Sequence, residues 1–293
     1  MMPFFDRNPT PDEAAVLALM LSTFSDGTGT QREVDGSSRA GWKEIERVFS
    51  EFFTGQKHSE DKDVFDLIVE DWQNKGSFYG ASIKSKQLTG KKTPFHGNID
   101  ARAYLEISNS PARMWASITA KSRLLPSDFE ARKFPQRMGD ALIATITDWK
   151  LARKRTFELI NANSSVDLAK SYYITLSLSP YSGVARQIHI ASFPMQFPDV
   201  KWRYASGRCL RADDPAFPGE PLLDWYPFSG GQLKYYPRFS TAHFSSEILT
   251  TQPAVEVSIL KKASAYFEDE MNEHLSRLDP EQIALIEHLI AVD

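Results

Sequence analysis

The stretch DVFDLIVEDWQNKGSFYGASIKSKQL, residues 63–88, decides the fold that we expect for this chain. Residues 64–69 form an apolar run with one acid in it, which predicts a buried strand. Residues 78–88 alternate between two kinds of side chain, as a strand with two different faces does. The residues between them, 73–77, have the composition of a turn. The sequence therefore predicts an antiparallel hairpin.

Polar side chains on this hairpin indicate a site at one end of a sheet. Asp66 interrupts the apolar run, where a carboxylate without a partner or a metal is costly. Alternation places Ser82, Lys84 and Lys86 on one face of the second strand. The hairpin would bring Asp66 beside Ser82 and Lys84, where an acid and a lysine can hold a divalent metal against a phosphate. A simple ion pair on a solvated face is the alternative.

The combination of Asp66, a spacer and Ser82-Ile83-Lys84 resembles the PD-(D/E)xK nuclease motif, in a variant found among type II restriction endonucleases. The resemblance covers about residues 40–125. It implies an α/β fold with a restriction-endonuclease-like core, in which helices flank a mixed central β-sheet. It also implies one or two Mg²⁺ ions per active site and hydrolysis of phosphodiester bonds at a specific double-stranded DNA sequence. Lys84 would be the catalytic lysine, with Lys86 as its rival.

Two departures from the family pattern concern the metal ligands. Val64-Phe65 precedes Asp66 where the family often has proline, and Ser82 replaces an acid. A second carboxylate would then have to come from elsewhere. The helix expected over residues 41–53 carries Glu44 and Glu46, of which we favour Glu44 because it lies at the edge of the apolar stripe. Glu106, on a strand that we expect beside the lysine strand, is the other candidate.

Basic and polar side chains gather in three further places that DNA could contact. Residues 89–94 form a basic turn with two neighbouring lysines. Residues 113–155 hold ten basic and four acidic side chains, an excess that favours binding to phosphates. A glycine loop between aromatic residues, 225–238, resembles an element that enters a DNA groove. Each place has an alternative without DNA. The basic turn can simply be solvated, the cations near the C-terminus of the long helix can stabilise its dipole, and the glycine loop can be a hairpin whose aromatic residues pack in the core. The expected DNA-binding residues are Lys91, Lys92, Arg113, Arg153, Lys154, Arg155, Gln232, Lys234 and Arg238.

Composition excludes several other classes of protein. The chain has 293 residues, of which 42% are hydrophobic, a net charge of −4 and one cysteine, Cys209. One cysteine allows no intrachain disulfide and no cysteine-rich zinc site. Walker, zincin and serine-hydrolase motifs do not occur in it. Without a long apolar run or a signal-peptide pattern, we expect no membrane partner and a cytoplasmic location, in a prokaryote if the resemblance holds.

The rest of the chain predicts a β-rich C-terminal elaboration. We expect a nuclease core with N-terminal helices over residues 1–170 and a DNA-recognition part over 171–293, or one continuous domain. Loops are expected over 25–41 and 213–219. Strands are expected over 101–108, 171–179, 184–193, 201–206 and 255–260. Helices are expected from residue 10, from residue 111 and over 135–161, 261–277 and 280–291.

The expected function is that of a type II restriction endonuclease, working as a homodimer because a symmetric site calls for a symmetric enzyme. A nicking or repair nuclease on the same core is the nearest alternative. A DNA-binding or regulatory protein on a degenerate core is a second class, since Ser82 can mark lost metal affinity. A protein-interaction domain without any DNA role is the third.

Overall fold

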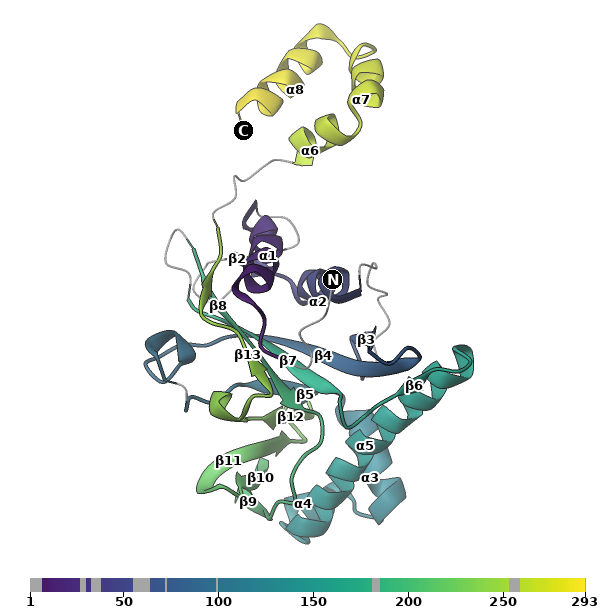
Figure 1. Cartoon of the computed structure of the whole chain (residues 1–293), viewed down its shortest axis with the longest axis vertical. Coiled ribbons are helices and arrows are strands. Elements are labelled where there is room, and N and C mark those ends of the chain that lie inside the picture. Colours follow the sequence, from purple (N-terminus) through teal and green to yellow (C-terminus); the bar gives the residue numbers. More distant parts are fainter. Residues whose placement is uncertain are drawn as a thin grey trace.

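The computed structural model describes residues 7–26, 30–32, 38–54, 64–71, 73–98, 100–180, 185–252 and 259–292. Its helices are α1 (Pro11–Ser22), α2 (Trp42–Thr54), α3 (Pro111–Ser122), α4 (Pro126–Glu130), α5 (Pro135–Ile160), α6 (Ile259–Tyr266), α7 (Glu268–Leu275) and α8 (Pro280–Val292). Figure 1 shows α1 and α2 on one side of a mixed sheet, and a second sheet with α3, α4 and α5 on the other. The expected mixed α/β class is confirmed.

The mixed sheet has the order β13-β8-β7-β4-β3, with β14 pairing β8 and β6 pairing β4. The hairpin predicted from residues 63–88 lies at its edge, where Leu67 pairs antiparallel with Ala81. Next to it β4 runs parallel to β7, and Ser82 is opposite Tyr173. Its strands are β3 (Leu67–Glu70), β4 (Ser77–Gln87), β6 (Ser165–Val166), β7 (Tyr172–Leu178), β8 (Gln187–Pro194), β13 (Phe244–Ser245) and β14 (Leu249–Thr250).

The second sheet is antiparallel, with the order β5-β12-β11-β10-β9. Both sheets combine strands from before and after residue 170, so the boundary expected there does not coincide with a division between the sheets. Of the loop expected over 213–219, only residues 215 and 216 form a turn, and the other residues belong to the two strands that the turn joins, β10 and β11. The strands are β5 (Leu105–Ser108), β9 (Trp202–Ser206), β10 (Cys209–Asp214), β11 (Phe217–Tyr226) and β12 (Gln232–Tyr235).

Two apolar clusters hold these layers together. One packs α1 and α2 against the face of the mixed sheet that carries Tyr79, Ala81 and Ile83. The other joins the opposite face to α3, α4, α5 and the second sheet, with Trp225 and Phe129 at its centre. Strand alternation sends odd-numbered residues of β4 to the first cluster, and so leaves the even-numbered polar ones for the other face.

Local sequence explains several of these elements. Thr10 and Glu13 form a capping box at the start of α1, as the Thr-Pro-Asp-Glu sequence predicts. The turn between β3 and β4 closes through the Asn74 amide, which donates to the Asp71 carbonyl at 3.2 Å. Asp279 accepts hydrogen bonds from two amides at the start of α8 and so caps that helix.

Four expected elements are corrected. The strand predicted over 64–69 begins only at Leu67, because Asp66 uses its side chain to bond the neighbouring strand. Part of the loop expected over 25–41 pairs as β1 (Thr30–Arg32) and β2 (Ser38–Ala40). The helix expected over 261–277 divides at Phe267, whose backbone is not helical. Of the strand expected over 255–260, the described residues 259 and 260 belong to α6, and the others lie outside the described residues.

None of the helices in the described part of the chain combines the length and the apolar character that a membrane crossing requires.

Candidate functional site

A pocket with a volume of about 630 Å³ opens beside the first residue of β3, where β4 extends past β3 and stays paired with β7. The β3 ladder stops at Asp66, whose amide donates to the Ala81 carbonyl at 2.9 Å. Beyond that point the Asp66 side chain replaces the backbone, because its Oδ2 accepts a hydrogen bond from the Ile83 amide at 2.6 Å. Asp66 is therefore held against β4 by both its backbone and its carboxylate.

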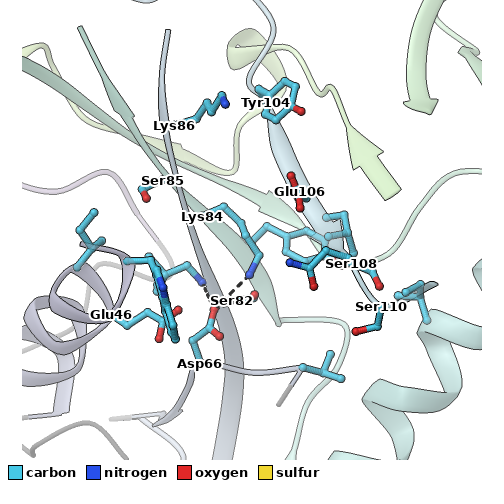
Figure 2. A pocket seen from close by; sticks show the side chains of 18 of the residues that line it. Glu46, Asp66, Ser82, Lys84, Ser85, Lys86, Tyr104, Glu106, Ser108 and Ser110 are labelled. Atoms are coloured by element: carbon cyan, nitrogen blue, oxygen red, sulfur yellow. Dashed lines mark hydrogen bonds and ion pairs between the residues drawn. The ribbon is translucent and has the colours of Figure 1, made fainter. Parts of the chain in front are cut away.

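The expected meeting of Asp66, Ser82 and Lys84 is present in the structure. Ser82 Oγ donates to Asp66 Oδ2 at 2.9 Å, and Lys84 Nζ lies 3.5 Å from the same oxygen. Figure 2 shows the three side chains pointing toward one another inside the pocket. All these contacts go to Oδ2, so Oδ1 is the oxygen of this carboxylate best placed to bind a metal.

Lys86 and Lys84 share a strand face but have different neighbours. Lys86 Nζ lies 5.1 Å from the centre of the Tyr104 ring, a cation–π distance, whereas Lys84 pairs with Asp66. Both lysines line the pocket. The geometry therefore favours Lys84 over Lys86 as the lysine that acts beside the Asp66 carboxylate.

The acid of α2 that lines the pocket is Glu46, not Glu44, which corrects our preference. Glu44 lies outside the lining and pairs with Arg47 at 3.1 Å. Glu46 is only 8% exposed. It precedes the buried Phe49 by three positions and the buried Phe53 by seven, so it belongs to the buried stripe of the helix. That spacing was the signal in the sequence that could have identified it.

Glu46 and Asp66 share one region of the pocket (Figure 2). Burial, and then the negative charge of Asp66, raise the pKa of Glu46 to about 7, while Lys84 and Lys43 act in the opposite direction. The charge of Asp66 therefore disfavours the ionised form of Glu46, and a bound cation would remove that conflict.

Glu106 reaches the pocket from another direction than we expected. Its strand, β5, is not hydrogen-bonded to β4 but belongs to the second sheet, where Glu106 lies opposite Lys234. It nevertheless lines the pocket, on the wall across from Asp66 (Figure 2). The second sheet brings it there because β5 pairs with β12, a strand more than 120 residues later in the chain.

The start of α3 and the middle of α5 form another wall. Ser110 and Arg113 line the pocket there, and the Ser110 side chain makes no capping hydrogen bond at the start of α3. The Arg113 guanidinium stacks on the Trp149 ring at 4.2 Å. Arg153 follows Trp149 by one helical turn, so it extends the same helix face beyond the pocket.

The other expected DNA-binding residues lie outside the pocket lining. Lys91 and Lys92 are exposed on a bend after β4, and Arg155 is exposed on α5. Lys154 pairs with Glu158 at 2.8 Å and donates a hydrogen bond to the Val166 carbonyl.

The glycine loop between β11 and β12 has a structural role that its sequence did not reveal. Gly231 has a φ of +63°, and a Cβ there would lie 2.5 Å from Pro111, so the loop packs directly against the start of α3. Gln232, at the start of β12, is partly exposed.

The two cations after this loop are held within the protein. Lys234 Nζ lies 4.7 Å from the Tyr226 ring centre. Arg238 is 11% exposed, bonds Glu220 at 2.6 Å and stacks on Phe217 at 3.6 Å. Internal partners therefore occupy Arg238, an arrangement that does not favour base reading by it.

The described residues contain no group of three or more His, Cys, Asp or Glu side chains arranged to hold a metal. Asp66 and Glu46 form a pair of carboxylates, which fits the chemistry of Mg²⁺, an ion that binds one or two carboxylates and keeps several waters. Four basic side chains, Lys43, Lys84, Lys86 and Arg113, line the same pocket beside three acids. With a divalent cation present, the pocket would carry a positive charge suited to phosphate.

Comparisons with protein-family models, with curated proteins and with solved structures find no match to this chain.

Proposed function

We propose that this protein is a metal-dependent endonuclease that hydrolyses phosphodiester bonds in double-stranded DNA at a specific sequence, as type II restriction endonucleases do. The observation that carries the proposal is the convergence of Ser82, Ile83 and Lys84 on one oxygen of Asp66, inside a pocket rich in basic side chains. The resemblance to the nuclease motif supports the same reading of these residues.

Each pocket residue has a distinct part in the proposed reaction. Asp66, through Oδ1, and Glu46 would hold Mg²⁺, which supplies stabilisation of negative charge on the phosphate and on the leaving oxygen. Ser82 keeps the Asp66 carboxylate in place by its hydrogen bond. Lys84 would orient the attacking water and stabilise the charged phosphate. Glu106, across the pocket, is the candidate for binding a second ion.

The arrangement of substrate and subunits is part of the same proposal. Arg113 and, one turn beyond the pocket, Arg153 would contact phosphates next to the scissile one. Cleavage of both strands at a symmetric site would require a homodimer. A cytoplasmic location in a prokaryote follows from the same resemblance.

The test is incubation of the purified protein with mixed-sequence plasmid DNA, in Mg²⁺ or in EDTA, beside Asp66→Asn and Lys84→Met. The exposed Lys201→Met is the matched control for loss of a lysine charge. Discrete fragments that need Mg²⁺, persist in the control and disappear in both site variants would support the proposal. Uncut DNA in every condition would refute it.

A binding protein on a degenerate nuclease core is the second candidate. The observation that favours it concerns Ser82, which stands where the family motif has an acid. Its hydroxyl donates a hydrogen bond to Asp66. That reading expects DNA to be retained on a gel at low salt without cleavage, whereas absence of retention would argue against both candidates.

A further inference from the structure

Tyr173 lines the pocket and was not among the residues that the sequence singled out. It is in the middle of β7, between β4 and β8, and pairs with Ser82 on one side and Phe193 on the other. Residues paired across neighbouring strands project from the same face of the sheet. Tyr173 therefore stands beside Ser82 on the pocket face, and its side chain lines the pocket.

The hydroxyl of Tyr173 is a buried polar group that has no hydrogen-bond partner among the described residues. The residue is 2% exposed. An unpaired buried hydroxyl is costly, and such groups in native proteins call for an explanation. Trp202 and Trp225 also carry unpaired buried N–H groups, but neither lines the pocket.

The surroundings of this hydroxyl make it a hydrogen-bond donor. Burial, then Tyr235 and Asp66, raise the pKa of Tyr173 well above its ordinary value, so the phenol keeps its proton. The ring is fixed by Phe197 and by Lys150, whose Nζ lies 5.3 Å from the ring centre. A neutral donor on a rigid strand suits an anion with oxygen acceptors, and the basic side chains of the pocket favour the same class of ligand.

We propose that the Tyr173 hydroxyl donates a hydrogen bond to a non-bridging oxygen of the phosphate group that binds beside Lys84. The inference rests on the proposed function in taking that phosphate to be the scissile one. Tyr173 and Lys84 would then contact the phosphate from two neighbouring strands, while Arg113 faces it from α3. The hydrogen bond would position the phosphate for attack and become stronger as negative charge develops.

The test compares Tyr173→Phe with Tyr235→Phe, a matched control that loses a hydroxyl from a buried tyrosine whose ring centre is 6.3 Å from that of Tyr173. Three quantities are measured for each: the free energy of unfolding without ligand, the rise in Tm caused by inorganic phosphate relative to chloride at equal ionic strength, and the rate of Mg²⁺-dependent plasmid cleavage. We expect Tyr173→Phe to be at least as stable as wild type, because it removes an unpaired buried hydroxyl.

We also expect Tyr173→Phe to lose most of the phosphate-induced rise in Tm and to cleave roughly 10- to 100-fold more slowly, the effect of losing one hydrogen bond to a charged group. The control should keep both properties. A Tyr173→Phe variant that is less stable than wild type without ligand would reveal an internal partner for the hydroxyl and overturn the inference.

The outcomes separate this inference from the proposed function. If wild type cleaves DNA and Tyr173→Phe cleaves at the same rate, the inference is wrong and the nuclease proposal stands. If wild type does not cleave DNA, but phosphate stabilises wild type and not Tyr173→Phe, the phosphate contact stands and the nuclease proposal fails. If neither cleavage nor the response to phosphate distinguishes the variant from wild type, the inference is wrong.

Discussion

Replacing Gly80 with alanine should displace Phe65 and, through it, Asp66. A Cβ at Gly80 would lie 2.5 Å from two carbons of the Phe65 ring, although the Gly80 backbone itself has no left-handed φ. Carbon atoms pack best at about 3.5–4.0 Å, so the ring would have to move by about 1 Å. Phe65 is 4% exposed, and the neighbouring Asp66 is bonded directly to β4.

The expected cost combines two opposing effects. Overpacking a core costs about 1–3 kcal/mol. Replacing glycine by alanine lowers the conformational entropy of the unfolded chain, which stabilises the folded protein by about 0.4–1 kcal/mol. We therefore expect Gly80→Ala to lower the free energy of unfolding by about 1–2 kcal/mol. If the protein is a nuclease, cleavage should fall as well, because Asp66 moves with Phe65.

Urea unfolding followed by circular dichroism measures this change. Gly207→Ala is the matched control, since the nearest atom to its new Cβ would be Nη2 of the flexible Arg132 side chain at 3.4 Å. The double variant Phe65→Leu/Gly80→Ala should be more stable than the sum of the single changes predicts, by at least about 0.5 kcal/mol. A Gly80→Ala protein as stable as wild type, or strict additivity in the double variant, would refute the packing argument.

The other predictions concern a buried lysine, a helix cap and the second carboxylate. Burial lowers the pKa of Lys150 from 10.5 to about 7, so within that pH window the unfolded chain binds a proton that the folded chain lacks. The free energy of unfolding of wild type, measured in urea, should then rise with pH more steeply than that of Lys150→Met, by up to about 1.4 kcal/mol per pH unit. Equal slopes of unfolding free energy against pH in the two proteins would contradict this. Thr10→Ala should lower the unfolding free energy by about 1 kcal/mol because the capping box with Glu13 is lost, and an unchanged urea midpoint would show that the cap contributes nothing. Glu46→Gln should reduce Mg²⁺-dependent cleavage by at least roughly 10- to 100-fold, the loss that follows removal of a group from the outer shell of a metal. Glu44→Gln should cleave like wild type. Loss of cleavage in Glu44→Gln but not in Glu46→Gln would favour Glu44 as the metal ligand.

Features encoded within one short stretch were predicted well from the sequence. The turn over residues 73–77, the alternation of β4 and the long helix over 135–160 all follow from neighbouring residues. The contact of Asp66 with Ser82 and Lys84 belongs to the same group, because a tight hairpin brings its two strands together in a register that the turn dictates. The β11–β12 hairpin was named only as the alternative to a loop that enters a DNA groove, and the packing of its glycine loop on α3 was not expected.

The composition of the rest of the pocket was decided by the tertiary structure. Glu46 and not Glu44 lines the pocket because α2 turns the side that carries Phe49 toward the sheet, an orientation that depends on the whole apolar cluster beneath it. Glu106 arrives on a second sheet whose partner strand lies far along the chain, and internal partners hold Arg238.

The sequence by itself determined the hairpin and the carboxylate–lysine contact at its end, since turn chemistry and side-chain alternation act over a few residues. Only the tertiary structure decided which acid of α2 and which other elements line the pocket, and that Tyr173 is among the lining residues. Those contacts join residues from β7, α2, α3 and the second sheet, and their meeting depends on how separate apolar faces pack, which no local pattern specifies.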